Sequence, residues 1–259
     1  MDPRSADDPA ETPLEAGGHR LWVRLTHWAI AGAAIALIVS GVTILMAHPR
    51  LYWGHAGNDL TQPLLEIPLG PNHHHGSWSK ATPFFASGGG PVTANRLVEP
   101  WNQNSWARSL HFLAAWIFLA GLIAYLALGT TTGHLRRYLW PRRAELSRDN
   151  IGRDIKAHLR LPMPDAEPGP PYAILQKLSY VLIALVLLPL MFLTGISMSP
   201  AIAADYPFLL DLFGGTQSAR TLHFFAFVAI TLFLVVHLVM ILLTRPLRQL
   251  RGMTLGNRR

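Results

Sequence analysis

Four apolar stretches dominate this chain of 259 residues. Each is long enough to cross a bilayer, which takes about 20 residues of helix because the hydrocarbon core is about 30 Å thick. Half of the residues are hydrophobic and only 14% are charged, whereas soluble domains usually have about a quarter charged. Backbone polar groups in lipid must be satisfied within the segment, so each stretch is expected to be a helix. The predicted spans are residues 25–46, 110–129, 172–198 and 221–244.

These spans define the fold class and the domain organisation. The sequence predicts an all-α protein, an integral membrane four-helix bundle with a long irregular external loop at residues 47–109. Residues 21–251 are expected to form one domain between cytoplasmic tails at residues 1–20 and 252–259. The first tail is polar and acidic and lacks the apolar core and cleavage site of a signal peptide. Because the loop is far longer than a connection requires, we interpret it as a cap and a docking surface.

The distribution of basic residues predicts the orientation. Of the 22 Lys and Arg residues, 17 lie before span one, after span four, between spans two and three, or at the start of span three, and five lie in the other two loops. Cytoplasmic segments of membrane proteins carry such an excess of positive charge. We therefore expect a multi-pass protein of the bacterial inner membrane with both termini in the cytoplasm. Topology accounts for the net charge of +7, so no nucleic-acid partner is expected.

A short pattern recurs three times where a polar segment meets an apolar span. Ionisable side chains at membrane depth are costly unless a buried partner engages them. A haem meets this need, because neutral imidazoles ligate its iron and a guanidinium pairs with a propionate at the membrane edge. The alternatives are hydrogen-bonded structural histidines, and arginines that only anchor the helices at the interface. The copies are Arg24–His27, Arg108–His111 and Arg220–His223, and a fourth histidine, His237, lies inside the last span.

Alternating topology places the four histidines at two depths. His27 and His237 lie toward the cytoplasmic ends of their spans, and His111 and His223 toward the external ends. The fourteen residues from His223 to His237 turn a helix by about 1400°, within about 40° of four full turns, and advance it by about 21 Å. One helix therefore presents one ligand to each pair, and the sequence predicts two haems. Because the chain has no cysteine, both are expected to be non-covalent haem b.

This framework resembles the di-haem cytochrome b subunits of formate dehydrogenase and nickel–iron hydrogenase and the related bacterial cytochrome b561 proteins. The resemblance runs from His19 to Arg251 and includes the histidines that open spans one and two and the pair fourteen residues apart in span four. The enlarged first external loop and two fragments are most similar to the thiosulfate reductase cytochrome b branch. The fragments are Leu51-Tyr52-Trp53-Gly54 and Gly133-His134-Leu135-Arg136-Arg137.

The resemblance implies a function and a pairing of the ligands. It pairs His27 with His237 and His111 with His223, as the depths also predict. It further implies an electron-transfer subunit of a respiratory-chain complex, which exchanges electrons between the quinone pool and an oxidoreductase on the external face, often a molybdopterin enzyme. In such relatives quinone binds near the inner haem, so the polar residues that open span three are candidates for quinone contacts. These are Gln176, Lys177, Ser179 and Tyr180, and the alternative for each is a helix end at the interface.

Two other functions remain open from the sequence. The first is a stand-alone quinone reductase that uses a small oxidant such as superoxide, as other cytochrome b561 relatives do. The long external loop argues against it, because a small oxidant needs no docking platform. The second is not redox chemistry at all, but a membrane anchor or a transporter whose intramembrane histidines carry protons. We interpret His134 as an interfacial residue, with proton chemistry on quinone as the alternative.

Overall fold

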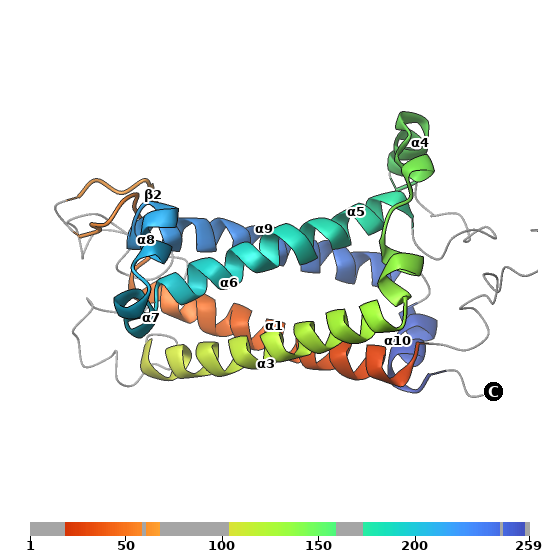
Figure 1. Cartoon of the computed structure of the whole chain (residues 1–259), viewed down its shortest axis with the longest axis horizontal. Helices are drawn as coiled ribbons and strands as arrows, with labels where there is room; N and C mark the ends of the chain where they lie inside the picture. Colours follow the sequence, from red (N-terminus) through yellow and green to blue (C-terminus); the bar gives the residue numbers. More distant parts are fainter. Residues whose placement is uncertain (1–18, 59–60, 68–103, 159–172, 244–245, 257–259) are drawn as a thin grey trace, which may run out of the picture. The chain divides into compact units, whose positions relative to one another are not determined.

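The computed structural model describes residues 19–58, 61–67, 104–158, 173–243 and 246–256. Within them, four helical stretches are long and apolar enough to cross a membrane, and the predicted all-α membrane bundle is confirmed (Figure 1). The predictions for the first tail and for most of the first loop fall on residues 1–18 and 68–103, which lie outside the described part. The four stretches are Leu21–Ala47 (α1), Ser105–Thr131 within α3 (Asn104–Thr131), Ile174–Ser197 and Thr216–Leu243 (α9).

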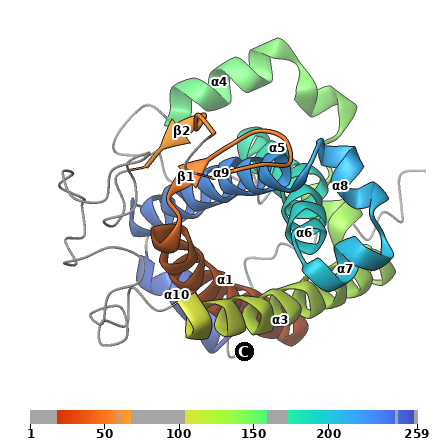
Figure 2. The ribbon, with the colours of Figure 1, turned by 90° about the vertical axis from the view of Figure 1, so that its left-hand side faces the viewer.

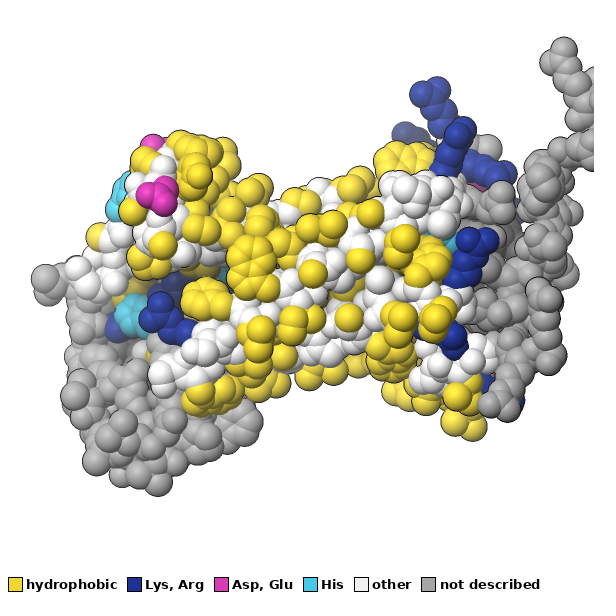
Figure 3. Space-filling model, turned by 60° about the horizontal axis from the view of Figure 1, so that its bottom comes forward, with side chains coloured by type: hydrophobic (Ala, Val, Ile, Leu, Met, Phe, Trp, Pro, Cys, Tyr) yellow, Lys and Arg dark blue, Asp and Glu magenta, His cyan; other side chains and the backbone are white. Residues whose placement is uncertain are grey.

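The spans expose most of their apolar side chains. Trp116 is 64% exposed and Leu242 is 69% exposed, although both lie within spans. On the face seen in Figure 3, hydrophobic side chains cover the helices, and Lys and Arg gather toward the helix ends. Such a surface suits lipid as the solvent, because hydrocarbon tails solvate apolar side chains and basic side chains reach the head groups.

The third span contains a π-helical segment, Ile183–Leu187 (η5), between α5 (Ile174–Leu182) and α6 (Leu188–Ser197). Pro189 lies in the first turn of α6. A proline lacks the N–H that would bond one turn earlier, and its ring collides with the carbonyl four residues before it. The wider π turn accommodates the proline at this point, so the span continues to Ser197.

Short elements lie between the spans and after the last span in the described residues. Two-residue strands form an antiparallel pair in which Arg50 lies opposite Glu66, so the described part of the long loop is more regular than the sequence predicts. These elements are β1 (Arg50–Leu51), β2 (Leu65–Glu66), the π-helix η3 (Leu135–Leu139), the 3₁₀-helix η4 (Arg143–Leu146), α4 (Arg148–His158), α7 (Pro200–Asp205), α8 (Phe208–Phe213) and α10 (Pro246–Thr254).

The chain divides into two compact units. Each of the four spans contributes one segment to each unit. The first unit also contains α4 and α10, and the second contains the strand pair with α7 and α8. The first unit comprises Met1–Ala29, Gly121–Lys177 and Val236–Arg259, and the second comprises Ile30–Ala120 and Leu178–Val235.

In the second unit, the chain that follows β1 caps the start of α9. The first N–H groups of a helix have no partner within it and need an external acceptor. The carbonyl of Gly54 accepts from the backbone N of Gln217 at 2.9 Å, and the N–H of Gly54 donates to Ser218 Oγ at 2.7 Å. The hydroxyl of Thr221 donates to the carbonyl of Tyr52 at 2.7 Å. The strands therefore lie beside the first turns of α9, the helix that carries His223 (Figure 2).

Candidate functional site

Two of the four predicted ligands face each other in the second unit. His111 comes from α3 and His223 from α9, and their ring centroids are 6.4 Å apart with the ring planes at 57°. Both imidazoles lie within membrane-spanning helices, where water is not available to solvate them. The structure thus brings together the pair that the topology predicts for one depth.

Each of these imidazoles is held through its Nδ1 atom by a buried hydroxyl. Ser40 Oγ in α1 lies 3.0 Å from His111 Nδ1, and Thr194 Oγ1 in α6 lies 3.0 Å from His223 Nδ1. Ser40 and Thr194 are both 0% exposed. With Nδ1 engaged, Nε2 is the nitrogen that each ring has left for another partner.

A glycine follows each hydroxyl residue and lies against the same ring. A Cβ atom added at Gly41 would be 3.5 Å from His111 Cε1, and one added at Gly195 would be 3.3 Å from His223 Cε1. The absence of a side chain therefore lets α1 and α6 approach the imidazoles closely. The two hydroxyl–glycine pairs, residues 40–41 and 194–195, form equivalent supports in two different spans.

This arrangement fits a haem better than a bare metal ion. A metal–nitrogen bond is about 2 Å long, and the bonded nitrogen lies about 1.2 Å from the centroid of its ring. Two rings that bind one metal from opposite sides therefore have centroids about 6.4 Å apart. The observed separation is 6.4 Å. Among the described residues, no group of three or more His, Cys, Asp or Glu side chains could hold a metal ion. Two nitrogen donors match an iron whose remaining four ligands belong to a porphyrin.

The other two predicted ligands share the first unit. His27 lies in α1 and His237 in the last turns of α9, close enough for the charges of the two rings to interact. The edge of the His27 ring meets Trp28 at a centroid distance of 5.3 Å. His27 Nδ1 is buried and has no hydrogen-bond partner among the described residues, unlike Nδ1 of His111 and of His223.

The three predicted arginines occupy different surroundings. Arg24 donates to the carbonyl of Thr254 at 3.0 Å, at the end of α10, where a cation also complements the helix dipole. Arg220 donates to the carbonyl of His48 in the second unit. Arg108 is exposed on α3. Contact with a propionate stays a prediction for all three.

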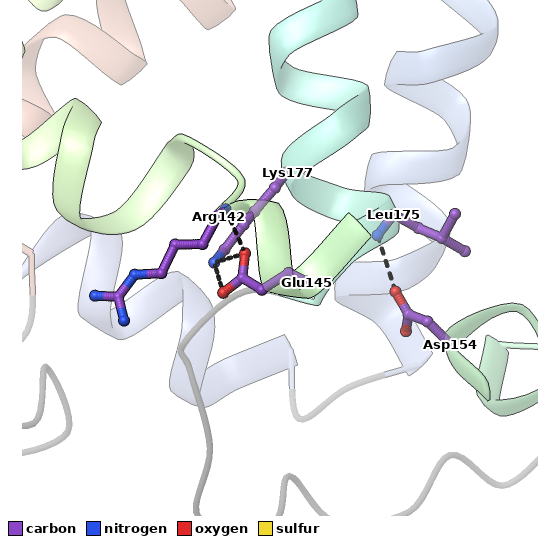
Figure 4. Close-up of polar contacts among 5 residues, drawn as sticks. All are labelled: Arg142, Glu145, Asp154, Leu175 and Lys177. Atoms are coloured by element: carbon purple, nitrogen blue, oxygen red, sulfur yellow. Dashed lines mark hydrogen bonds and ion pairs between the residues drawn. The ribbon is translucent and has the colours of Figure 1, made fainter. Parts of the chain in front are cut away.

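The quinone candidates are divided between the units. Gln176 and Lys177 belong to the first unit, and Ser179 and Tyr180 to the second. Lys177 is 4% exposed, and its Nζ lies 2.9 Å from both carboxylate oxygens of Glu145 (Figure 4). The ring of Tyr180 meets Phe233 edge-on at 6.1 Å.

The first unit contains an aromatic cluster that the sequence does not predict. The rings of Trp22 and His134 meet edge-on at 5.4 Å, and Tyr125 packs against both. Burial lowers the pKa of His134, and the nearby charges of His19 and Arg20 lower it further. Burial and the charge of Arg24 likewise lower the pKa of His19. Both imidazoles are therefore held in the neutral form.

Comparison with known proteins identifies the family. The model of the prokaryotic cytochrome b561 family matches residues 18–256, so the chain belongs to this family, whose members bind haem b. The chain is 25% identical over 225 residues to the Azospira oryzae protein named "Putative protein-methionine-sulfoxide reductase subunit YedZ1", covering 87% of this chain and 90% of that protein. No solved structure matches. The predicted resemblance to cytochrome b561 proteins is confirmed, and the branch within it stays a prediction.

Proposed function

We propose that this protein is the membrane subunit of an oxidoreductase complex, and that it carries electrons between the quinone pool and a partner enzyme on the external face. The observation that carries the proposal is the half-buried pair of His111 and His223, whose ring centroids lie 6.4 Å apart and whose Nδ1 atoms are each held by a buried hydroxyl. A haem b bound at such a pair supplies reversible one-electron chemistry.

We further propose two haem sites, with His27 and His237 as the ligands of the second. The division of the chain supports this, because His27 and His237 share one unit and His111 and His223 share the other. The continuous helix α9 contributes one ligand to each pair. The protein's own part is to hold four neutral imidazoles at two levels, to keep water away with apolar helices, and to offer arginines to the propionates.

Three observations support a partner subunit and its position. The YedZ1 relative is named as a reductase subunit, so a comparable chain works with another subunit. The resemblance to formate dehydrogenase subunits adds a molybdopterin enzyme as the class of partner. The 17-to-5 division of basic residues supports cytoplasmic termini and an external loop at residues 47–109, which would then face this partner.

Haem content tests the proposal. The purified chain should contain two haem b per polypeptide with low-spin bis-histidine spectra. The replacement His223→Ala should remove one haem, and His237→Ala should remove the other, as distinguished by a redox titration of the haem that remains. A content of about one haem per polypeptide, or the loss of the same haem in both variants, would contradict the two-site arrangement.

A second measurement separates this function from its rivals. The proposal expects quinol to reduce the haems of the purified chain, and fast reoxidation to require the partner subunit. Sustained turnover with superoxide in the absence of any partner would favour the stand-alone reductase. A folded chain purified without haem would favour the anchor or the transporter.

A further inference from the structure

We propose that the buried hydroxyls of Ser40 and Thr194 are positioning residues that fix the tautomer of His111 and His223 and lower the midpoint potential of the haem bound between them. The inference rests on the proposed function, because it takes these two histidines as axial ligands. It adds two residues and a tuning role that the histidine pattern does not contain.

The first step concerns the single proton of each hydroxyl. Ser40 Oγ lies 2.7 Å from the carbonyl of Ala36, and Thr194 Oγ1 lies 2.6 Å from the carbonyl of Leu190. A carbonyl oxygen can only accept, so the hydroxyl proton must point to it at such a distance. Each hydroxyl then has only lone pairs to offer to the imidazole. It therefore accepts a hydrogen bond from Nδ1–H.

The second step concerns the other nitrogen of the ring. A neutral imidazole carries one proton, so a ring protonated at Nδ1 has a free lone pair at Nε2. This is the tautomer that ligates a metal. The helix fixes it before any cofactor arrives, because the hydroxyl is tied to its own backbone one turn earlier.

The third step concerns the electronic effect. A hydrogen bond accepted from the remote N–H of a metal-bound imidazole makes that imidazole more basic and favours the more highly charged, oxidised metal. Both axial ligands of the second-unit site carry this bond, at the same 3.0 Å. In the first unit, Nδ1 of His27 has no such partner among the described residues. The hydroxyls therefore lower the potential of the second-unit haem relative to the same site without them.

The test uses the full chain with its haems bound. Thr194→Val is nearly isosteric and removes the acceptor, whereas Thr194→Ser keeps it, and Ser40→Ala removes the other acceptor. Thr43→Val is the matched control, because Thr43 is a hydroxyl residue in α1 with 2% exposure whose hydroxyl donates to the carbonyl of Val39 at 2.9 Å. Potentiometric titration of the haem absorbance and low-spin EPR are recorded for every variant.

Thr194→Val and Ser40→Ala should each raise one midpoint potential and leave the other in place. An effect of about tenfold on the preference for oxidised iron corresponds to 59 mV for one electron. The EPR signal of that same haem should shift, Thr194→Ser should restore the wild-type potential, and Thr43→Val should change nothing.

Unchanged potentials in Thr194→Val and Ser40→Ala would overturn the inference while the proposed function stood, as would equal shifts in Thr43→Val. If Thr194→Val does not retain its haem, retention and an unshifted potential in Thr194→Ser, together with a raised potential in Ser40→Ala, still support the inference. A wild-type chain without haem would instead overturn the proposed function.

Discussion

The ion pair between Lys177 and Glu145 should secure the segment that precedes the third span. The side chain of Lys177 is 5% exposed and that of Glu145 is 26% exposed. Breaking a fully buried pair by removing one partner costs about 3–5 kcal/mol, and a surface pair contributes about 0–1 kcal/mol. Because one end of this pair is buried and the other is partly solvated, we expect Glu145→Gln to cost about 2 kcal/mol.

We expect Glu145→Gln to cause local opening of η4 and α4, because these short elements can detach while the spans stay folded. A loss of about 2 kcal/mol corresponds to about 30-fold faster exchange of the backbone amides that this opening exposes. Hydrogen exchange of residues 143–158, measured by mass spectrometry on the purified chain in detergent, reports this change. Asp149→Asn is the matched control, since Asp149 is exposed in the first turn of α4, and its exchange should stay within about threefold of wild type.

The double variant Glu145→Gln/Lys177→Met distinguishes a lost attraction from a stranded charge. With methionine in place of Lys177, no uncompensated ammonium remains buried. Amide exchange of residues 143–158 should therefore return most of the way to the wild-type rate. The reasoning would be refuted by a single variant that exchanges like wild type, or by a double variant as unprotected as the single one.

The same pair predicts a pH dependence. Burial acts to raise the pKa of Glu145, but the hydrogen bond from Lys177 and the neighbouring groups of Arg142 outweigh it, so the pKa lies below its ordinary value of 4.5. The contribution of the pair to stability is therefore complete above that value and is lost as the pH falls through the lower pKa of the folded state. Protection of residues 143–158 should fall on acidification in the wild type and much less in Glu145→Gln.

Three further predictions concern single residues. Gly195→Ala should disturb the ring of His223 and broaden the low-spin EPR signal, because the added Cβ would lie 3.3 Å from Cε1 of that ring. Gly41→Ala should be tolerated, because its Cβ would lie 3.5 Å from Cε1 of His111, an ordinary van der Waals contact. Gly215→Ala should lower the thermal unfolding temperature, since its φ is +118° and its Cβ would lie 2.5 Å from the backbone of Gly54. The lowered pKa of His134 means that acidification below about 6.5 should destabilise the wild type, and His134→Gln should remove part of that dependence in thermal unfolding scans.

The membrane spans could be predicted because length and hydropathy determine them almost alone. Each predicted span falls mainly within an observed helix, and the uncertain parts are helix ends, which hydropathy does not define. The assembly of His111 with His223 could also be predicted, since alternating topology and helical rise order residues by depth. The ion pair of Lys177 could not, because Glu145 lies 32 residues away in a polar loop whose path no periodic pattern encodes.

The hydroxyl partners of the ligands were not predicted either, although the sequence contains a signal. Serine and threonine within a membrane helix usually bond to their own backbone, so Ser40 and Thr194 have no distinctive pattern by themselves. Their meaning depends on which ring from another helix packs beside them. The repeated hydroxyl–glycine dipeptide, at residues 40–41 and 194–195, is the feature that could have marked them.

The continuity of α9 makes the two proposed sites depend on one helical register. His223 and His237 lie in one uninterrupted helix that ends at Leu243. Inserting one residue between them would rotate His237 by about 100° and move it by about 1.5 Å relative to His223. Such a change would turn one ligand away from its partner while leaving the capped start of α9, and the ring held by Thr194, undisturbed. The fourteen-residue interval is therefore a geometric requirement of two sites that share a helix, whatever the other spans contribute to each site.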